Sequence, residues 1–198
     1  YALGYCIHTL EFHALRGWGV AFLAFVAGST GVGGTLFSPT TILTALGLIA
    51  TFASVMGNEA AIYFGRRRLI AITMIASAVC AVLLGFVGPQ SYVFAAAMLL
   101  AYGLFISLDS SSLTAGTAGS AEPSRRGATL AVHSMLGYAG GFVGPLIVGW
   151  ALDLSGGTSA TAWAFAYSLV AALTFAGLIV FLIMRPGELA GDRGKADA

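Results

Sequence analysis

The sequence predicts an all-α integral membrane protein with six transmembrane helices. Of its 198 residues, 58% are hydrophobic and only 9% are charged, and the mean hydropathy is +0.91. In soluble domains roughly a quarter of the residues are charged. A soluble globule and a disordered chain are therefore both excluded. The net charge of +1 is too small to create a positive field that would attract a nucleic acid. The surface of this protein must therefore face membrane lipid.

Six apolar stretches have the length of about 20 residues that a membrane-spanning helix needs. They cover residues 1–28, 41–64, 69–87, 92–116, 128–152 and 161–184. Turns rich in Gly, Pro and Ser separate them. We expect one six-helix transmembrane bundle over residues 1–185 and a polar tail over residues 186–198. Because the first residue is Tyr1 and not a methionine, we also expect the parent gene to extend further upstream.

Positive charges mark one side of the predicted bundle. The connections after the second and fourth spans and the tail hold Arg66, Arg67, Arg68, Arg125, Arg126, Arg185, Arg193 and Lys195. The connections after the first, third and fifth spans hold no Lys or Arg. Cytoplasmic loops carry the excess of Lys and Arg, so both chain ends are predicted to be cytoplasmic.

No catalytic or metal-binding motif accompanies this pattern. Cys6 and Cys80 lie in apolar stretches and match neither a disulfide framework nor a zinc site. The sequence contains no HExxH and no GxSxG. We therefore expect neither an enzyme nor a protein with a metal or another cofactor.

The ionisable residues inside the spans follow a pattern that repeats after every three helices. The first span holds His8, Glu11, His13 and Arg16, and the fourth holds Asp109, whereas the third and sixth are apolar. Two triples that each begin with a polar helix and end with an apolar one are typical of a 3+3 inverted repeat. The first helix of each triple is then expected to line a water-filled cavity, and the third to face lipid. Intramembrane charges usually face such a cavity.

Helical spacing brings several of these polar residues onto common faces. His8 and Asp109 each lie about seven residues, or about 10 Å, from the cytoplasmic end of their spans, which predicts that they lie within about 10–12 Å of each other and converge with Glu11. Arg16 has two interpretations: it binds an anionic substrate, or it forms a structural ion pair with Glu11. The candidate residues of the substrate or proton pathway are Tyr5, His8, Glu11, Arg16, Tyr102, Asp109 and Ser112. His13, about 140° from His8, is expected to be a packing or interface residue.

The fifth span carries glycines four residues apart, a spacing that lets membrane helices approach closely. This helix-packing motif comprises Gly137, Gly140, Gly141, Gly144, Pro145 and Gly149. Pro145 lacks the amide hydrogen that would bond to Gly141, so a bend is expected there.

Three features resemble the major facilitator superfamily, specifically the C-terminal six-helix half of its fold. The glycine–proline run resembles the motif of the family's fifth helix and its repeat counterpart, the eleventh. The stretch from Gly57 to Arg68 resembles the cytoplasmic basic motif, here Glu59, Gly65, Arg66, Arg67 and Arg68. The first span resembles the seventh helix of some bacterial members. Where the family's basic motif usually has Asp and Arg, this chain has Ile62 and Tyr63, and Glu59 is the candidate substitute for that carboxylate.

The resemblance implies a secondary transporter that moves a small solute by alternating access. Lipid, a solute, protons and an N-terminal six-helix half are the expected partners, and the bacterial inner membrane is the expected location. The alternative is a non-transporting six-helix membrane protein, such as a signalling or assembly partner or a fragment of a transporter.

Overall fold

The computed structural model describes residues 1–32, 37–184 and 192–195, and within these residues all regular structure is helical. The α-helices are α1 (Ala2–Thr30), α2 (Pro39–Phe64), α3 (Arg66–Phe86), α4 (Tyr92–Leu108), α5 (Ser110–Ser120), α6 (Arg126–Leu154) and α7 (Ala160–Ile183). Two short 3-10 turns, Gly88–Gln90 and Pro123–Arg125, lie in the connections.

Six stretches of helix are long and apolar enough to cross a membrane, because α4 and α5 together form one stretch from Tyr92 to Ser120. The predicted all-α membrane fold with six spans is therefore confirmed. The spans begin and end within four residues of the positions expected from the hydropathy pattern.

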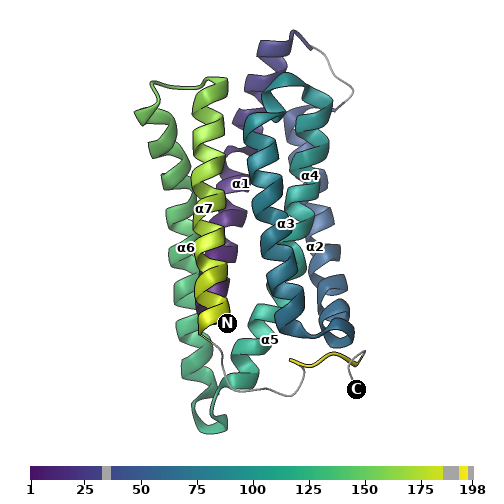
Figure 1. Ribbon diagram of the computed structural model, residues 1–198, viewed down its shortest axis with the longest axis vertical. Coiled ribbons are helices and arrows are strands. Elements are labelled where there is room, and N and C mark those ends of the chain that lie inside the picture. Colours follow the sequence, from purple (N-terminus) through teal and green to yellow (C-terminus); the bar gives the residue numbers. More distant parts are fainter. Residues whose placement is uncertain (33–36, 185–191, 196–198) are drawn as a thin grey trace.

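Tyr1, directly before α1, and residues 192–195 lie at the same end of the bundle (Figure 1). The turn at Gly65 between α2 and α3 and the short α5 lie at this end too, and Arg66 begins α3 directly after the turn. We call it the basic end of the bundle. Of the expected polar tail, residues 192–195 lie here, whereas 186–191 and 196–198 fall outside the described residues, as does Arg185.

The fourth span is interrupted at Asp109, where a single continuous helix was expected over residues 92–116. Asp109 separates α4 from α5, although its carbonyl still accepts a bond from the amide of Leu113 at 2.8 Å. The neighbouring carbonyl of Leu108 faces α2 so closely that a Cβ on Gly57 would collide with it. The break therefore coincides with a backbone contact between two spans and with the position of an intramembrane carboxylate.

α1 and α6 pack together through glycines. A Cβ on Gly140 would collide with the carbonyl of Cys6, and a Cβ on Gly144 with the carbonyl of Leu10. The close approach that the spacing of these glycines predicted is thus present, and its partner is α1. α6 runs as one helix through Pro145, whose carbonyl accepts a bond of 2.8 Å from the indole of Trp18.

The third span was expected to face lipid, and only one of its sides is exposed: Ile72, Ile75 and Val79 lie on the surface, whereas the other side is buried. Half of the most apolar stretch of α3 is buried, against 28% for α2. α3 packs along α7, where a Cβ on Gly85 would lie 3.1 Å from the Cα of Ala164. The core of this side holds the fully buried Trp163 with Phe22 from α1 at 5.1 Å between ring centroids. An apolar composition did not distinguish a lipid-facing helix from one packed against another helix.

Candidate functional site

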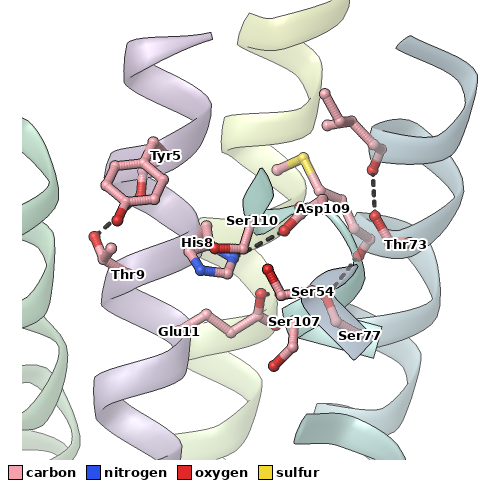
Figure 2. Close-up of polar contacts among 12 residues, drawn as sticks. Tyr5, His8, Thr9, Glu11, Ser54, Thr73, Ser77, Ser107, Asp109 and Ser110 are labelled. Atoms are coloured by element: carbon pink, nitrogen blue, oxygen red, sulfur yellow. Dashed lines mark hydrogen bonds and ion pairs between the residues drawn. The ribbon is translucent and has the colours of Figure 1, made fainter. Parts of the chain in front are cut away.

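A buried hydrogen bond joins the first and fourth spans inside the bundle. The imidazole Nδ1 of His8, on α1, lies 2.8 Å from Oδ1 of Asp109, between α4 and α5 (Figure 2). Both side chains are almost completely buried. His8 and Asp109, which the sequence placed at equal depth in their spans, are therefore in direct contact at hydrogen-bond distance. Such an imidazole–carboxylate pair can hold a proton and pass it on.

Glu11 is buried one helical turn further along α1 and points toward α3. Its Oε2 accepts a hydrogen bond of 3.2 Å from Oγ of Ser77, and Figure 2 shows both side chains beside the His8–Asp109 pair. Its Oε1 has no hydrogen-bond partner among the described residues. No cation of the described chain forms an ion pair with it either. A buried carboxyl in this setting can be neutralised by taking up a proton.

Tyr102 and Ser112 lie in the interior of the bundle and not on an open surface. Both are at most 1% exposed, and neither hydroxyl has a hydrogen-bond partner within the described residues. The expectation that the polar faces of the first and fourth spans both line an open groove is therefore wrong for these two residues. The face of the fourth span that carries Tyr102, Asp109 and Ser112 packs against neighbouring helices instead.

Arg16 does not pair with Glu11, which removes one of its two interpretations. The guanidinium of Arg16 is exposed and lies over the ring of Phe12, 5.4 Å from its centroid. Five residues separate Glu11 from Arg16, which puts the two side chains about 140° apart around the helix. One faces the interior and the other faces outward.

Stacked rings connect the His8–Asp109 pair to α6. The ring of Tyr5 is stacked on the ring of His133 with a centroid distance of 4.0 Å and on the ring of His8 at 5.5 Å. His133 is buried, and its two ring nitrogens lie 3.3 and 3.0 Å from the hydroxyls of Thr114 and Thr117. This row of rings starts at His133, which was not among the candidate residues. A histidine inside a predicted span was the signal that could have identified it.

The open part of the site is a groove between α1 and α2. A depression of about 210 Å³ in this groove is lined by His8, Phe12, Arg16, Gly47, Ala50, Thr51, Ser54, Ser107 and Ser110. The hydroxyl of Ser54 is 2.7 Å from that of Ser111, which ties α2 to α5 at its edge. His8 is thus the member of the buried pair that reaches the open groove.

A second depression, of about 310 Å³, lies between α1 and α6. Tyr5, Thr9, His13, Ser134, Gly137, Tyr138, Gly141 and Phe142 line it. His13 is exposed, and its Nδ1 lies 2.9 Å from the carbonyl of Thr9 on its own helix. His13 therefore lies on a different face of α1 from His8, as its angular position predicted.

Arg66 of the basic motif contacts Asp192 of the tail and not Glu59. Arg66 forms an ion pair with Asp192 at 3.3 Å, and the hydroxyl of Tyr1 donates a hydrogen bond to the same carboxylate. Burial and the neighbouring Asp192 raise the pKa of the Tyr1 hydroxyl, so it stays protonated and remains a donor. Glu59 is exposed and forms no ion pair in the described part of the chain.

A narrow turn allows this contact at the basic end. Gly65 adopts a positive φ of 91°, and a Cβ on Gly194 would lie 2.6 Å from the amide nitrogen of Gly65. Arg67 is half-buried and Arg68 is exposed, and neither forms an ion pair within residues 1–32, 37–184 and 192–195. Asp192 therefore gives Arg66 the carboxylate partner that Ile62 does not provide.

No metal site accompanies these groups: in the described residues, no three His, Cys, Asp or Glu side chains are placed to bind an ion together. A comparison with protein-family profiles matches residues 6–198 to the Major Facilitator Superfamily. The chain belongs to the Major Facilitator Superfamily. A comparison with curated proteins gives no match. Membership of this superfamily makes the protein a multi-pass membrane protein of the transporter type, and its six-helix bundle fits one half of the superfamily's fold.

Proposed function

We propose that this chain is the C-terminal half of a secondary active transporter that carries a small solute across the bacterial inner membrane by alternating access. Both of its ends would be cytoplasmic, because the basic end carries the Arg residues. The observation that supports transport most strongly is the buried His8–Asp109 pair beside an open groove. Ionisable groups in a membrane interior are costly and usually serve transport or proton movement.

An N-terminal six-helix half would face the groove and close the pathway. α6 and α2 expose large apolar side chains on their surfaces, including Tyr138, Phe142 and Phe52. The second half would cover part of this surface, and the solute would bind between the halves near the middle of the bilayer. Rocking of one half against the other would then open the site to each side in turn.

Protons would couple to this movement through Glu11 and the His8–Asp109 pair. Glu11 forms no ion pair in the described chain, so a change in its protonation changes the charge of the bundle interior. His8 touches both the buried carboxylate of Asp109 and the open groove. This arrangement would let a proton pass between the interior and the bound solute.

The test is proton-driven uptake into proteoliposomes that hold the full-length protein. With an inward proton gradient, we expect accumulation of at least one solute from a panel of radiolabelled organic acids, amines and sugars. The variant Glu11→Gln should insert and fold normally but lose this accumulation, because the amide keeps the shape of the side chain and carries no proton. Glu59→Gln, on the exposed surface of α2, is the matched control and should transport as the wild type does.

Two outcomes would contradict the proposal. If no solute enters faster than into protein-free vesicles, the non-transporting membrane bundle becomes the better interpretation. If Glu11→Gln leaves both transport and stability unchanged, Glu11 has no role in coupling. A loss of folding in this variant would instead assign a structural role to the Glu11–Ser77 contact.

A further inference from the structure

α1 directs three ionisable side chains into three different environments. His8 is paired with Asp109, and Glu11 is buried against Ser77. Arg16 is exposed, and no carboxylate in residues 1–32, 37–184 and 192–195 forms an ion pair with it. Of the three, Arg16 alone presents a full charge to the surface of the bundle.

The depth of Arg16 makes this exposure significant. Arg16 lies at the middle of α1, which runs from Ala2 to Thr30, and so is about 21 Å from either end of the helix. A cation at this depth is unfavourable in contact with lipid. The ring of Phe12 supports the guanidinium through a cation–π contact at 5.4 Å, which is a modest attraction. An anionic partner would satisfy the charge far better.

The surroundings of Arg16 are complementary to such a partner. On one side lies the 210 Å³ depression, whose polar lining consists of hydroxyls and the imidazole of His8. On the other side lies a depression of about 550 Å³, lined by Arg16, Val20, Thr40, Leu43, Thr44, Gly47 and Leu48. Neither lining contains a carboxylate. Arg16 thus stands between two depressions, and the second combines the apolar side chains of Val20, Leu43 and Leu48 with two threonines.

His8 adds a second nitrogen group to the polar pocket. Its Nδ1 contacts Asp109, and the ring lines the polar pocket. Ser110 lies beside His8 in Figure 2, and its side-chain hydroxyl forms no hydrogen bond with another described residue. A carboxylate beside Arg16 could accept hydrogen bonds from its guanidinium, and the hydroxyls that line the pocket offer further donors.

We propose that Arg16 binds the acidic group of an organic anion whose apolar body occupies the neighbouring depression lined by Val20, Leu43 and Leu48. This inference deepens the proposed function, because the anion would be the transported solute. Arginine suits the role because its guanidinium can form two parallel hydrogen bonds with a carboxylate. His8 lies about two helical turns from Arg16 along α1, with Phe12 between them, so it would stand at the far end of the pocket from the acidic group.

Ligand-dependent thermal unfolding of the purified full-length protein in detergent tests this proposal. Phenylacetate should raise the unfolding temperature in a concentration-dependent way, whereas the neutral phenylacetamide should not. In Arg16→Gln, the apparent affinity for phenylacetate should fall by about 10- to 100-fold, the loss expected for a hydrogen bond to a charged group. Arg16→Lys should retain part of the affinity. Because binding in detergent needs no transport, its failure is distinguishable from a failure of the proposed transport function.

Arg68→Gln is the matched control, because Arg68 is exposed at the basic end and outside the groove. It should leave phenylacetate binding unchanged. Equal shifts from phenylacetate and phenylacetamide, unchanged binding in Arg16→Gln, or an equal loss in Arg68→Gln would overturn the proposal. The proposal would also be overturned if neither phenylacetate nor a second organic anion, hexanoate, raised the unfolding temperature. A large drop in the ligand-free stability of Arg16→Gln alone would show that Arg16 is paired within the full-length protein, which also contradicts the proposal.

Discussion

α1 makes close backbone contacts on one side and polar side-chain contacts on another. Toward α6, it packs backbone to backbone, because Gly140 and Gly144 leave no room for side chains. Toward α3, α4 and α5, it presents His8 and Glu11, which form polar contacts with Asp109 and Ser77. The first side is a seam of fixed shape, and the second holds groups that can gain or lose protons.

The difference indicates how one helix can combine attachment with function. Close glycine contacts tolerate little displacement, since van der Waals packing depends steeply on distance. Hydrogen bonds between ionisable side chains depend on protonation and can exchange partners. We therefore expect substitutions at the glycine seam to reduce folding alone, and substitutions on the polar side to alter both folding and transport.

Breaking the His8–Asp109 pair should have the largest effect on stability. Asp109→Ala leaves the buried imidazole of His8 without its partner and should lower the free energy of unfolding by roughly 3–5 kcal/mol. Thermal or denaturant unfolding in detergent measures this loss. His13→Ala is the control on the same helix, and because His13 is exposed, it should change stability by less than about 0.5 kcal/mol.

A double-mutant cycle sharpens this prediction. If the two residues stabilise each other, His8→Ala combined with Asp109→Ala should cost less than the sum of the two single substitutions. A coupling of about 0.5–3 kcal/mol is expected for residues in direct contact. Strict additivity would show that the contact contributes nothing to stability.

A methyl group in the glycine seam should have the next largest effect. Gly144→Ala places a Cβ against the carbonyl of Leu10 and should cost roughly 1–3 kcal/mol through forced displacement of the helices. Gly127→Ala, on the same helix with open space around its Cα, should be neutral or stabilising by up to about 1 kcal/mol. Equal stability of the two variants in an unfolding experiment would show that α1 and α6 do not pack through this glycine.

The contact between the tail and the basic motif should contribute less than either side of α1. Asp192→Asn removes the charge that pairs with Arg66 and should cost about 1 kcal/mol, because both side chains are largely buried. Glu122→Gln breaks a comparable ion pair with Arg125 that is well exposed, and should cost about 0.3 kcal/mol or less. A larger loss in Glu122→Gln than in Asp192→Asn, measured by unfolding, would be contrary to this order.

Residues that follow a helical period were predictable from the sequence. Counting along the spans placed His8 and Asp109 at equal depth, and the spacing of Gly140 and Gly144 indicated a close helix contact. Both inferences needed only the repeat of 3.6 residues per turn and the cost of charge in a membrane. The six spans followed from hydropathy for the same reason.

Contacts between distant segments were not predictable in this way. Ser77 lies in an apolar span that carries no charge, and its bond to Glu11 depends on how α3 packs. Asp192 contacts Arg66 because residues 192–195 lie at the basic end. The break at Asp109 likewise coincides with the approach of Gly57 from another span. Hydropathy does not specify which helices become neighbours, so these contacts required the three-dimensional structure.

The central claim, that the groove on the polar side of α1 belongs to a transport pathway, can be tested without knowing the solute. With Cys6 and Cys80 replaced by alanine in the full-length protein, Thr51→Cys places a thiol in the groove at the middle of α2. Val79→Cys, on the apolar outer surface of α3 and α7, is the control. A membrane-impermeant maleimide should label Thr51→Cys from either side of the membrane and Val79→Cys from neither. Labelling of Thr51→Cys from one side only under all conditions, or equal labelling of the two sites, would contradict the claim.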